Sequence, residues 1–378
     1  MKLDYTTIKT PAYLYNLDVL RQTLKVLKTE AEHYAYHIHY ALKANNNEKI
    51  LEEIADAGLG ADCVSGNEIK EALKRGFRAE AIAFAGVGKT DEEINFALDQ
   101  GIFSFNCESL PEIEVINELA SKKNTKASIA LRINPNVDAN THKYITTGIE
   151  ENKFGINLWE IDSILDRMDN MKNVELNGLH FHIGSQITDL DTFKNLCNRI
   201  NQIQEKFYAR QIIVNHINVG GGLGIEYYDP DNELIPDFKS YFKIFHDFLE
   251  LRPKQQLHFE LGRSIVGQMG SLLSKVIYVK KGSVKDFLII DAAMTDLIRP
   301  ALYQAYHKIE NLSSQSTQAV KYDVVGPVCE SSDIFAKSLA LPSSKRGDYI
   351  LIRSVGAYGQ VMASNYNMRD AAQVVFIE

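Results

Sequence analysis

Short apolar runs alternate with segments of helical periodicity through the first two-thirds of the chain. The runs are rich in β-branched and aromatic residues and are expected to form strands at 35–41, 60–64, 81–84, 102–105, 128–133, 174–181, 212–219 and 256–260. Helical patterns lie between most of them, at 48–56, 66–75, 91–99, 110–120, 158–167, 192–205 and 238–249, and a further helix is expected at 17–31. Repeated strand–helix units favour parallel strands, and their number predicts a (β/α)8 barrel of the TIM type.

The pattern changes after about Arg263. Strands are expected at 272–280, 284–291, 320–328, 348–355 and 373–377, with few helices between them. We therefore expect two domains, a barrel over 26–264 and a mostly β domain over 265–378. Residues 1–25 are expected to pack against the second domain.

The composition is that of a globular protein and narrows the possible partners. The chain has 378 residues, of which 45% are hydrophobic, and a formal net charge of −8 with both signs mixed along its length. No basic face or run is visible, which disfavours a nucleic-acid partner. The four cysteines lie far apart and no apolar run approaches about 18 residues, so we expect reduced thiols, no membrane association and a cytoplasmic location.

Residues suited to chemistry collect where the expected barrel strands end. Barrel enzymes place their active sites at the carboxyl ends of the strands. The residues at these ends are Lys43, Asp62, Arg132, His180, His182, the glycines 220–222, Glu260 and Arg263. Their common position predicts an active site there.

Each of these residues also has an ordinary interpretation. Lys43 is either a Schiff-base lysine in a partly desolvated pocket or a surface lysine that opens a helix. The glycines either surround a phosphate or make a tight turn. Glu260 either faces a pyridine nitrogen, making the ring an electron sink, or pairs with Arg263.

The histidines and one cysteine add two further candidates. His180 and His182 share one face of a strand, and His37 and His39 repeat that spacing, so either pair is structural or part of a metal site. His182 could also stack on a planar cofactor, with Ser185 donating to its phosphate. Cys329 lies beside carboxylates, which disfavour the thiolate and suit a proton donor.

Taken together, these motifs identify a family resemblance over essentially the whole chain. It rests on the strings at 40–45, 60–66, 153–155, 179–186, 218–224, 260–266, 296–300, 326–333, 356–358 and 362–369. The chain resembles the barrel-type (fold type III) pyridoxal phosphate (PLP)-dependent decarboxylases, which share their fold with alanine racemase. Within that group it is most similar to the diaminopimelate decarboxylases.

The resemblance implies a role for each matching residue. Lys43 would carry PLP through its amine, supported by Asp62, while His182 packs on the ring and Glu260 meets the pyridine nitrogen. Phosphate would be held by Ser185, Gly222, Gly262, Arg263 and Tyr358. Substrate would be gripped by Arg263, Arg299, Tyr303, Glu330 and Tyr358. Cys329, as proton donor, and Glu330 would reach into the site of a partner subunit in a homodimer.

The implied reaction is decarboxylation of meso-2,6-diaminopimelate to L-lysine and CO2, with PLP as the cofactor and no metal. Arg299 and Tyr303 suit the distal carboxylate of this substrate, although Asp296 could serve an amine. Alternatives are a related decarboxylase acting on ornithine, arginine or carboxynorspermidine, a metal-dependent barrel hydrolase built on the paired histidines, and a catalytically dead regulatory homologue.

Overall fold

The chain divides into two compact units in a computed structural model that describes residues 4–137 and 153–378. One unit comprises Leu24–Gly224 and Asp237–Gly262, and the other comprises Met1–Thr23, Ile225–Pro236 and Arg263–Glu378. Residues 225–236 thus group with the second unit, whereas the sequence pattern assigned them to the barrel. A single break at 264/265 misses this excursion because the segment lies between two barrel elements in the sequence.

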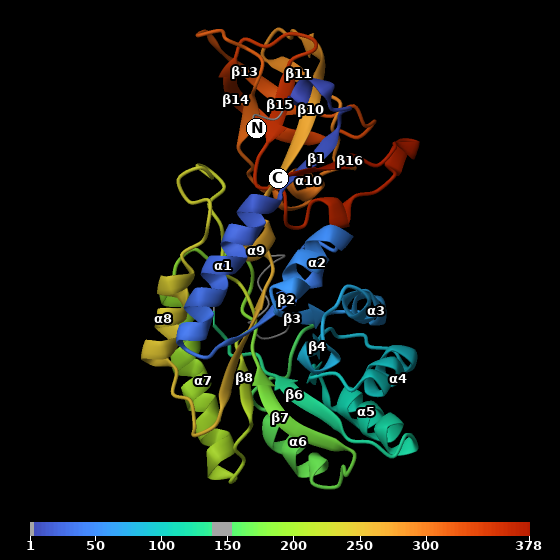
Figure 1. The fold of residues 1–378 in the computed structure, drawn as a ribbon, viewed down its shortest axis with the longest axis vertical. Coiled ribbons are helices and arrows are strands. Elements are labelled where there is room, and N and C mark those ends of the chain that lie inside the picture. Colours follow the sequence, from blue (N-terminus) through green and yellow to red (C-terminus); the bar gives the residue numbers. More distant parts are fainter. Residues whose placement is uncertain (1–3, 138–152) are drawn as a thin grey trace. The chain divides into compact units, whose positions relative to one another are not determined.

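The first unit is built on a closed barrel of parallel strands in the order β2 to β9, which confirms the predicted (β/α)8 barrel. Each strand lies at one of the expected apolar runs. Figure 1 shows the barrel strands with helices on their outer side. Their bounds are β2 His37–Ala41, β3 Gly60–Cys63, β4 Ile82–Phe84, β5 Ser104–Cys107, β6 Ala127–Arg132, β7 Val174–His180, β8 His216–Asn218 and β9 Gln256–Leu261.

Helices follow most of the strands, and side-chain caps fix where several of them begin. Asn47, Ser65, Thr90 and Ser109 each accept a hydrogen bond from a backbone N–H in the first turn of the helix that follows. The helices are α1 Leu17–His33, α2 Glu48–Asp56, α3 Gly66–Lys74, α4 Asp91–Gln100, α5 Leu110–Lys122, α6 Ile161–Met168, α7 Asp191–Ala209 and α8 Phe238–Phe248.

Aromatic side chains fill the layer between α8 and the barrel. Tyr241, Phe242 and Phe245 of α8 are buried, and their rings lie 5.0–5.6 Å from the ring of Phe259 on β9. Their spacing places them on one face of the helix, the face that is removed from water. This burial holds β9 in place, and Glu260 is the next residue on that strand.

The second unit is a mostly β structure, as predicted. Its sheet runs β12-β15-β10-β11-β13-β14, and β1 pairs with both β10 and β16. The strands are β1 Ala12–Asn16, β10 Gly270–Lys280, β11 Asp286–Ile290, β12 Ile309–Asn311, β13 Ala319–Val325, β14 Ile334–Pro342, β15 Tyr349–Ile352 and β16 Gln373–Ile377, with short helices α9 Arg263–Val266 and α10 Arg299–Tyr303.

Three of these strands were missed by the sequence pattern. β1 runs directly into α1 with no turn residue between them, so its apolar residues merge with the helical pattern. β12 is only three residues long. β14 carries Lys337 and Ser338 at its centre, and Ser338 has a φ of +51°, which interrupts the alternation of apolar and polar positions.

Candidate active site

Lys43 lies in a short 3-10 helix, Leu42–Ala44, that begins directly after β2. Its ammonium donates to Oδ2 of Asp62 at 2.5 Å. The lysine side chain is 40% exposed, whereas that of Asp62 is 1% exposed. The structure therefore holds this amine at an accessible position and orients it with a buried carboxylate.

Burial and the charge of Glu260 raise the pKa of Asp62, although Lys43 and His180 act in the opposite direction. The second oxygen of Asp62, Oδ1, is buried and has no hydrogen-bond partner within the described residues. An acceptor left unsatisfied in this way is costly unless another group binds it. Asp62 is thus suited to interact with a group bound beside Lys43.

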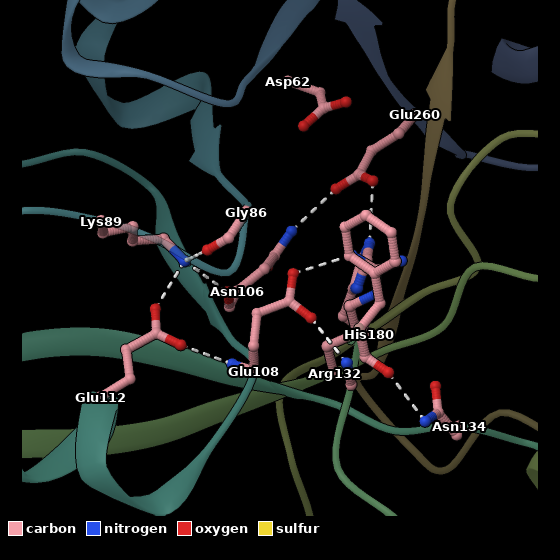
Figure 2. A network of polar contacts seen from close by, with 12 residues as sticks. Asp62, Gly86, Lys89, Asn106, Glu108, Glu112, Arg132, Asn134, His180 and Glu260 are labelled. Carbon is pink, nitrogen blue, oxygen red and sulfur yellow. Dashed lines mark hydrogen bonds and ion pairs between the residues drawn. The ribbon is translucent and has the colours of Figure 1, made fainter. Parts of the chain in front are cut away.

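Glu260 is buried and receives three hydrogen bonds. Asn106 donates a side-chain N–H to Oε1 at 2.8 Å, and Nε2 of His180 lies 2.8 Å from Oε2 (Figure 2). Asn218 also donates a side-chain N–H to Oε1 at 2.8 Å. Burial alone would raise the pKa of this carboxyl, but His180 and the charge of Lys43 lower it far below its usual value. Glu260 is therefore held as a carboxylate that can keep a proton on a bound partner.

The second nitrogen of His180, Nδ1, is buried and has no hydrogen-bond partner within residues 4–137 and 153–378. Since Nε2 faces an ionised carboxylate, it must be the nitrogen that carries the proton. The histidine thus acts as a hydrogen-bond donor to Glu260.

A second group of buried charges lies beside this carboxylate (Figure 2). Arg132 at the end of β6 forms a buried ion pair with Glu108 at 2.8 Å, and its guanidinium lies 4.7 Å from the ring of Phe154. Glu108 also accepts from the backbone N–H of Gly155 at 2.7 Å. These contacts hold the segment at 153–155, one of the family-like strings, against the ends of β5 and β6.

The glycine run follows β8. The backbone N–H of Gly220 donates to Oδ1 of Asn218 at 2.9 Å, and that of Gly221 donates to Nδ1 of His182 at 3.4 Å. Gly222 has a φ of +114°, and a Cβ there would lie 3.0 Å from the carbonyl oxygen of Gly184. Glycine is therefore required at this turn by both backbone conformation and space.

His182 follows β7, and Ser185 is three residues further along the chain. Burial, together with the charges of Arg132 and Lys43, lowers the pKa of His182 to about 3, so its ring is neutral at physiological pH. A neutral ring is suited to packing against a planar group. Gly262 directly follows β9, and a Cβ there would lie 3.0 Å from the Cβ of Ala44.

The remaining predicted residues lie in the second unit, where two guanidinium groups lie against Tyr227. Arg263 donates to the Tyr227 hydroxyl at 2.6 Å, and its guanidinium lies 4.9 Å from the ring of Tyr358. Arg299 lies 5.7 Å from the Tyr227 ring and donates to Nε2 of His307 at 3.4 Å. Both arginines are buried, so this cluster is a concentrated positive charge suited to an anion.

Tyr303 ends α10, the short helix that Arg299 begins. In the sequence, Asp296 is a candidate partner for a substrate amine. Its buried carboxyl instead accepts from the backbone N–H of Ala293 at 2.8 Å. Burial raises its pKa to about 6. Asp296 therefore stabilises its own loop.

Cys329 and Glu330 are exposed on a loop of the second unit. The backbone N–H of Cys329 donates to Oδ1 of Asn367 at 3.0 Å. Asp333 accepts from the backbone N–H groups of Val328 at 2.8 Å and of Met294 at 2.7 Å. The loop is thus fixed on both sides of a thiol that faces outward.

Several residues around Glu260 in the barrel unit, and several in the arginine cluster of the second unit, were missed by sequence analysis. Asn218 ends β8 and Asn106 is the last residue but one of β5, so the strand-end argument could have found them, whereas asparagine alone carries little signal. Tyr227 lies in the excursion at 225–236, and His307 lies before a strand that was not predicted. His37 and His39, proposed as one of two similar pairs, lie at the opposite end of the barrel from His180.

A scan of known families assigns this architecture. Residues 17–267 match the pyridoxal-dependent decarboxylases through their pyridoxal-binding domain. The chain belongs to this family. It is therefore a PLP-dependent decarboxylase, and the match spans all of β2 to β9.

Individual members of this decarboxylase family are similar over nearly the whole chain. The diaminopimelate decarboxylase of Bacteroides thetaiotaomicron is 58% identical over 97% of this chain and 95% of its own length. That of Aquifex aeolicus is 39% identical over 98% of this chain and 87% of its own length. The crystal structure of diaminopimelate decarboxylase from Helicobacter pylori in complex with L-lysine has a TM-score of 0.92 and 41% identity, covering 99% and 93% of the two chains.

The residues of the barrel unit fit the cofactor of this decarboxylase family. PLP presents an aldehyde, a pyridine nitrogen and a phosphate. The structure supplies an accessible amine on Lys43, an ionised Glu260 and a glycine turn at 220–222, and it leaves an acceptor of Asp62 unsatisfied. Each of these three groups of the cofactor thus has a matching group in the protein.

The structure also bears on the metal-site alternative and on membrane association. Within residues 4–137 and 153–378, no three His, Cys, Asp or Glu side chains are grouped so that they could hold a metal ion. Over the same residues, no helix is both long and apolar enough to cross a membrane.

Proposed function

We propose that this chain removes one carboxylate from meso-2,6-diaminopimelate to give L-lysine and CO2. The observation that carries the substrate assignment is the pair of buried guanidinium groups at Tyr227. Within residues 4–137 and 153–378, Arg299 forms no ion pair with a carboxylate, and it begins the helix that Tyr303 ends. A substrate with a distal carboxylate would satisfy this charge, whereas ornithine and arginine have none.

The protein's own residues have distinct tasks in this reaction. When bound, PLP supplies an electron sink for the pair left on the substrate carbon after CO2 departs. Lys43 binds the cofactor through its amine, and Asp62 orients that amine. Glu260, held ionised by its three donors, keeps a proton at the pyridine nitrogen, and His182 packs on the ring.

The remaining assignments follow the family resemblance. We propose that Ser185, Gly222, Gly262, Arg263 and Tyr358 hold the phosphate. Arg263, Arg299, Tyr303, Glu330 and Tyr358 hold the substrate, with Arg299 and Tyr303 at its distal carboxylate. Cys329 supplies the proton that replaces the lost carboxylate.

We also propose that the chain works as a homodimer in which Cys329 and Glu330 serve the partner's site. Both lie exposed on the second unit, where Met368, Tyr366 and Leu302 also expose large apolar side chains. Reduced cysteines are consistent with a cytoplasmic location, which we propose as well. Light scattering should give the mass of two chains. A mixture of Lys43→Ala and Cys329→Ala chains should regain activity that neither has alone.

The function is tested by incubating the purified chain with PLP and meso-diaminopimelate and measuring lysine and CO2. Ornithine and arginine serve as controls and should give little product. Borohydride reduction followed by mass spectrometry should place the added pyridoxyl phosphate on Lys43. Turnover of ornithine in preference to diaminopimelate would refute the substrate, and turnover by Lys43→Ala would refute the role of the lysine.

A further inference from the structure

A buried ion pair between Lys89 and Glu112 lies near Glu260 (Figure 2) and has no assigned role in binding substrate. The ammonium of Lys89 forms an ion pair with Oε1 of Glu112 at 2.6 Å, and the lysine and glutamate side chains are 1% and 11% exposed. Figure 2 shows it among the residues around Glu260. A lysine this deeply buried is costly unless all its donors are used.

Lys89 uses all three of its N–H donors. Besides Glu112, the ammonium donates to the carbonyl oxygens of Gly86 and Asn106, each at 2.9 Å. The other oxygen of Glu112 accepts from the backbone N–H of Glu108 at 2.6 Å. The ion pair therefore holds two backbone groups, one on each side of Cys107.

The two residues held in this way both send their side chains to charged groups. Asn106 donates its amide to Glu260 at 2.8 Å, and Glu108 pairs with Arg132 at 2.8 Å. Because Asn106 and Glu108 are two positions apart at the end of β5, their side chains leave the same face of the strand. A shift of this backbone would displace both contacts together.

We propose that Lys89 and Glu112 are positioning residues for Glu260, acting through Asn106. The ion pair fixes the Asn106 peptide so that its amide reaches the carboxylate that the proposed function assigns to the pyridine nitrogen. The hydrogen bond from Asn106 favours the ionised form of Glu260. The inference rests on the proposed function and concerns residues that touch neither substrate nor cofactor.

The test is a double-mutant cycle. Lys89→Met/Glu112→Gln removes the ion pair without leaving a buried charge, and Asn106→Leu removes the amide. Each should lower kcat for diaminopimelate about tenfold, because a hydrogen bond to a charged group is lost, while KM changes little. Combined, the changes should cost no more than Asn106→Leu alone, since the ion pair acts through that amide.

A second measurement does not depend on turnover. Titration of the apo-protein with PLP, followed by visible absorbance, should show weaker binding in each variant and no further weakening when they are combined. Arg75→Met is the matched control, because Arg75 contacts three carboxylates in the same barrel unit, those of Glu48, Glu52 and Glu71, without contacting Asn106. It should leave kcat and PLP affinity unchanged.

The following results would contradict the positioning role of Lys89 and Glu112. Additive losses in the cycle, or normal kcat and PLP affinity in a folded Lys89→Met/Glu112→Gln protein, would overturn the inference. If that variant does not fold, Glu112→Gln alone should give a smaller loss that disappears in the Asn106→Leu background, and persistence of the loss there would overturn it. Failure of the wild-type chain in the same assay would instead overturn the proposed function.

Discussion

The two ends of the barrel interior bury ionisable side chains in opposite ways. At the carboxyl end, Glu260 and Asp62 lie among charged or strongly donating neighbours. At the amino end, the rings of His39, His216 and His258 lie together with no carboxylate hydrogen-bonded to them within the described residues. The carboxyl end keeps Glu260 charged, whereas the amino end keeps its histidines neutral.

Only two positions along each strand separate these environments. His216 precedes Asn218 on β8, and His258 precedes Glu260 on β9. Glycine provides space for the rings: a Cβ at Gly178 would lie 2.0 Å from Nε2 of His216. Residues two apart share one face of a strand, so both side chains point into the barrel. Each must therefore suit its own layer of the interior, which is apolar and neutral at the histidines and charged at Glu260.

The hydrogen bonds of the histidine layer fix where its protons are. Nδ1 of His39 lies 3.0 Å from the carbonyl oxygen of Ala81, so it must carry the proton. Nε2 of His39 then accepts from Nδ1 of His258 at 2.8 Å. This leaves Nε2 of His258 without a proton and, within the described residues, without a partner. A proton added to this nitrogen would therefore find no acceptor among the described residues and would charge a buried ring.

The largest expected effect comes from removing the charge at the carboxyl end. Glu260→Gln keeps the shape of the side chain but cannot hold a proton on the pyridine nitrogen, so kcat should fall about 1,000-fold. His258→Gln, two residues earlier on the same strand, is the control and should leave kcat within about twofold. A loss of less than tenfold in Glu260→Gln would show that the ionised carboxylate is not required.

The next largest effect is on stability at the same end. Arg132→Leu leaves the buried carboxylate of Glu108 without its ionic partner, so the free energy of unfolding should fall by about 3 kcal/mol. Urea denaturation measures this change. Arg132→Leu/Glu108→Leu should recover part of the loss, because no buried charge remains. No recovery would mean that packing of the guanidinium on Phe154, and not the ion pair, stabilises this end.

The amino end should be sensitive to acid. Burial lowers the pKa of His39 and His258, and lowers that of His216 to about 3. As the pH falls, these histidines are therefore protonated in the unfolded chain before they are protonated in the folded protein. Their stabilising contribution is complete above pH 6.5 and is lost as the pH falls below that value. His258→Gln should remove about 1.4 kcal/mol of the stability that is lost between pH 7.5 and pH 5.5.

This difference is measured by urea denaturation of the wild type and His258→Gln at pH 7.5, 6.5 and 5.5. Comparing the two proteins cancels the contributions of His182 and His307, whose pKa values are also low. Parallel curves would show that the layer accepts a proton at little cost.

The smallest expected effect lies on the surface. Thr90 caps α4 in a capping box with Glu93, whose carboxylate also accepts from the backbone N–H of Gly66 at 2.8 Å. Thr90→Ala should lower the free energy of unfolding by about 1 kcal/mol and leave kcat unchanged. A fall in kcat would mean that the start of α4 affects the charged end of the barrel. Thermal unfolding and steady-state assays decide this.

The sequence was informative wherever one residue and its strand were enough. Lys43, Asp62 and Glu260 follow or end apolar runs, and the rule that barrels place chemistry at strand ends predicted their shared location. The eight barrel strands followed from apolar runs separated by helical patterns. These signals are local, so no alignment of distant segments was needed to find them.

What escaped prediction depends on contacts between distant segments. Lys89 follows Gly86-Val87-Gly88 and looks like a surface lysine, yet its three acceptors come from a loop, a strand and a helix. His37 and His39 suggested a metal site because spacing alone cannot show that the rings stack. The rings of His39 and His258 lie 5.2 Å apart at an angle of 22°.

The strand Ala12–Asn16 pairs with Gly270–Lys280 on one side and with Gln373–Ile377 on the other. During translation this strand is synthesised before nearly all of the barrel. Both strands that pair with it are synthesised much later. The hydrogen-bonding edges of β1 therefore have no native partner during most of translation, and this part of the sheet can be completed only after Gln373–Ile377 has left the exit tunnel.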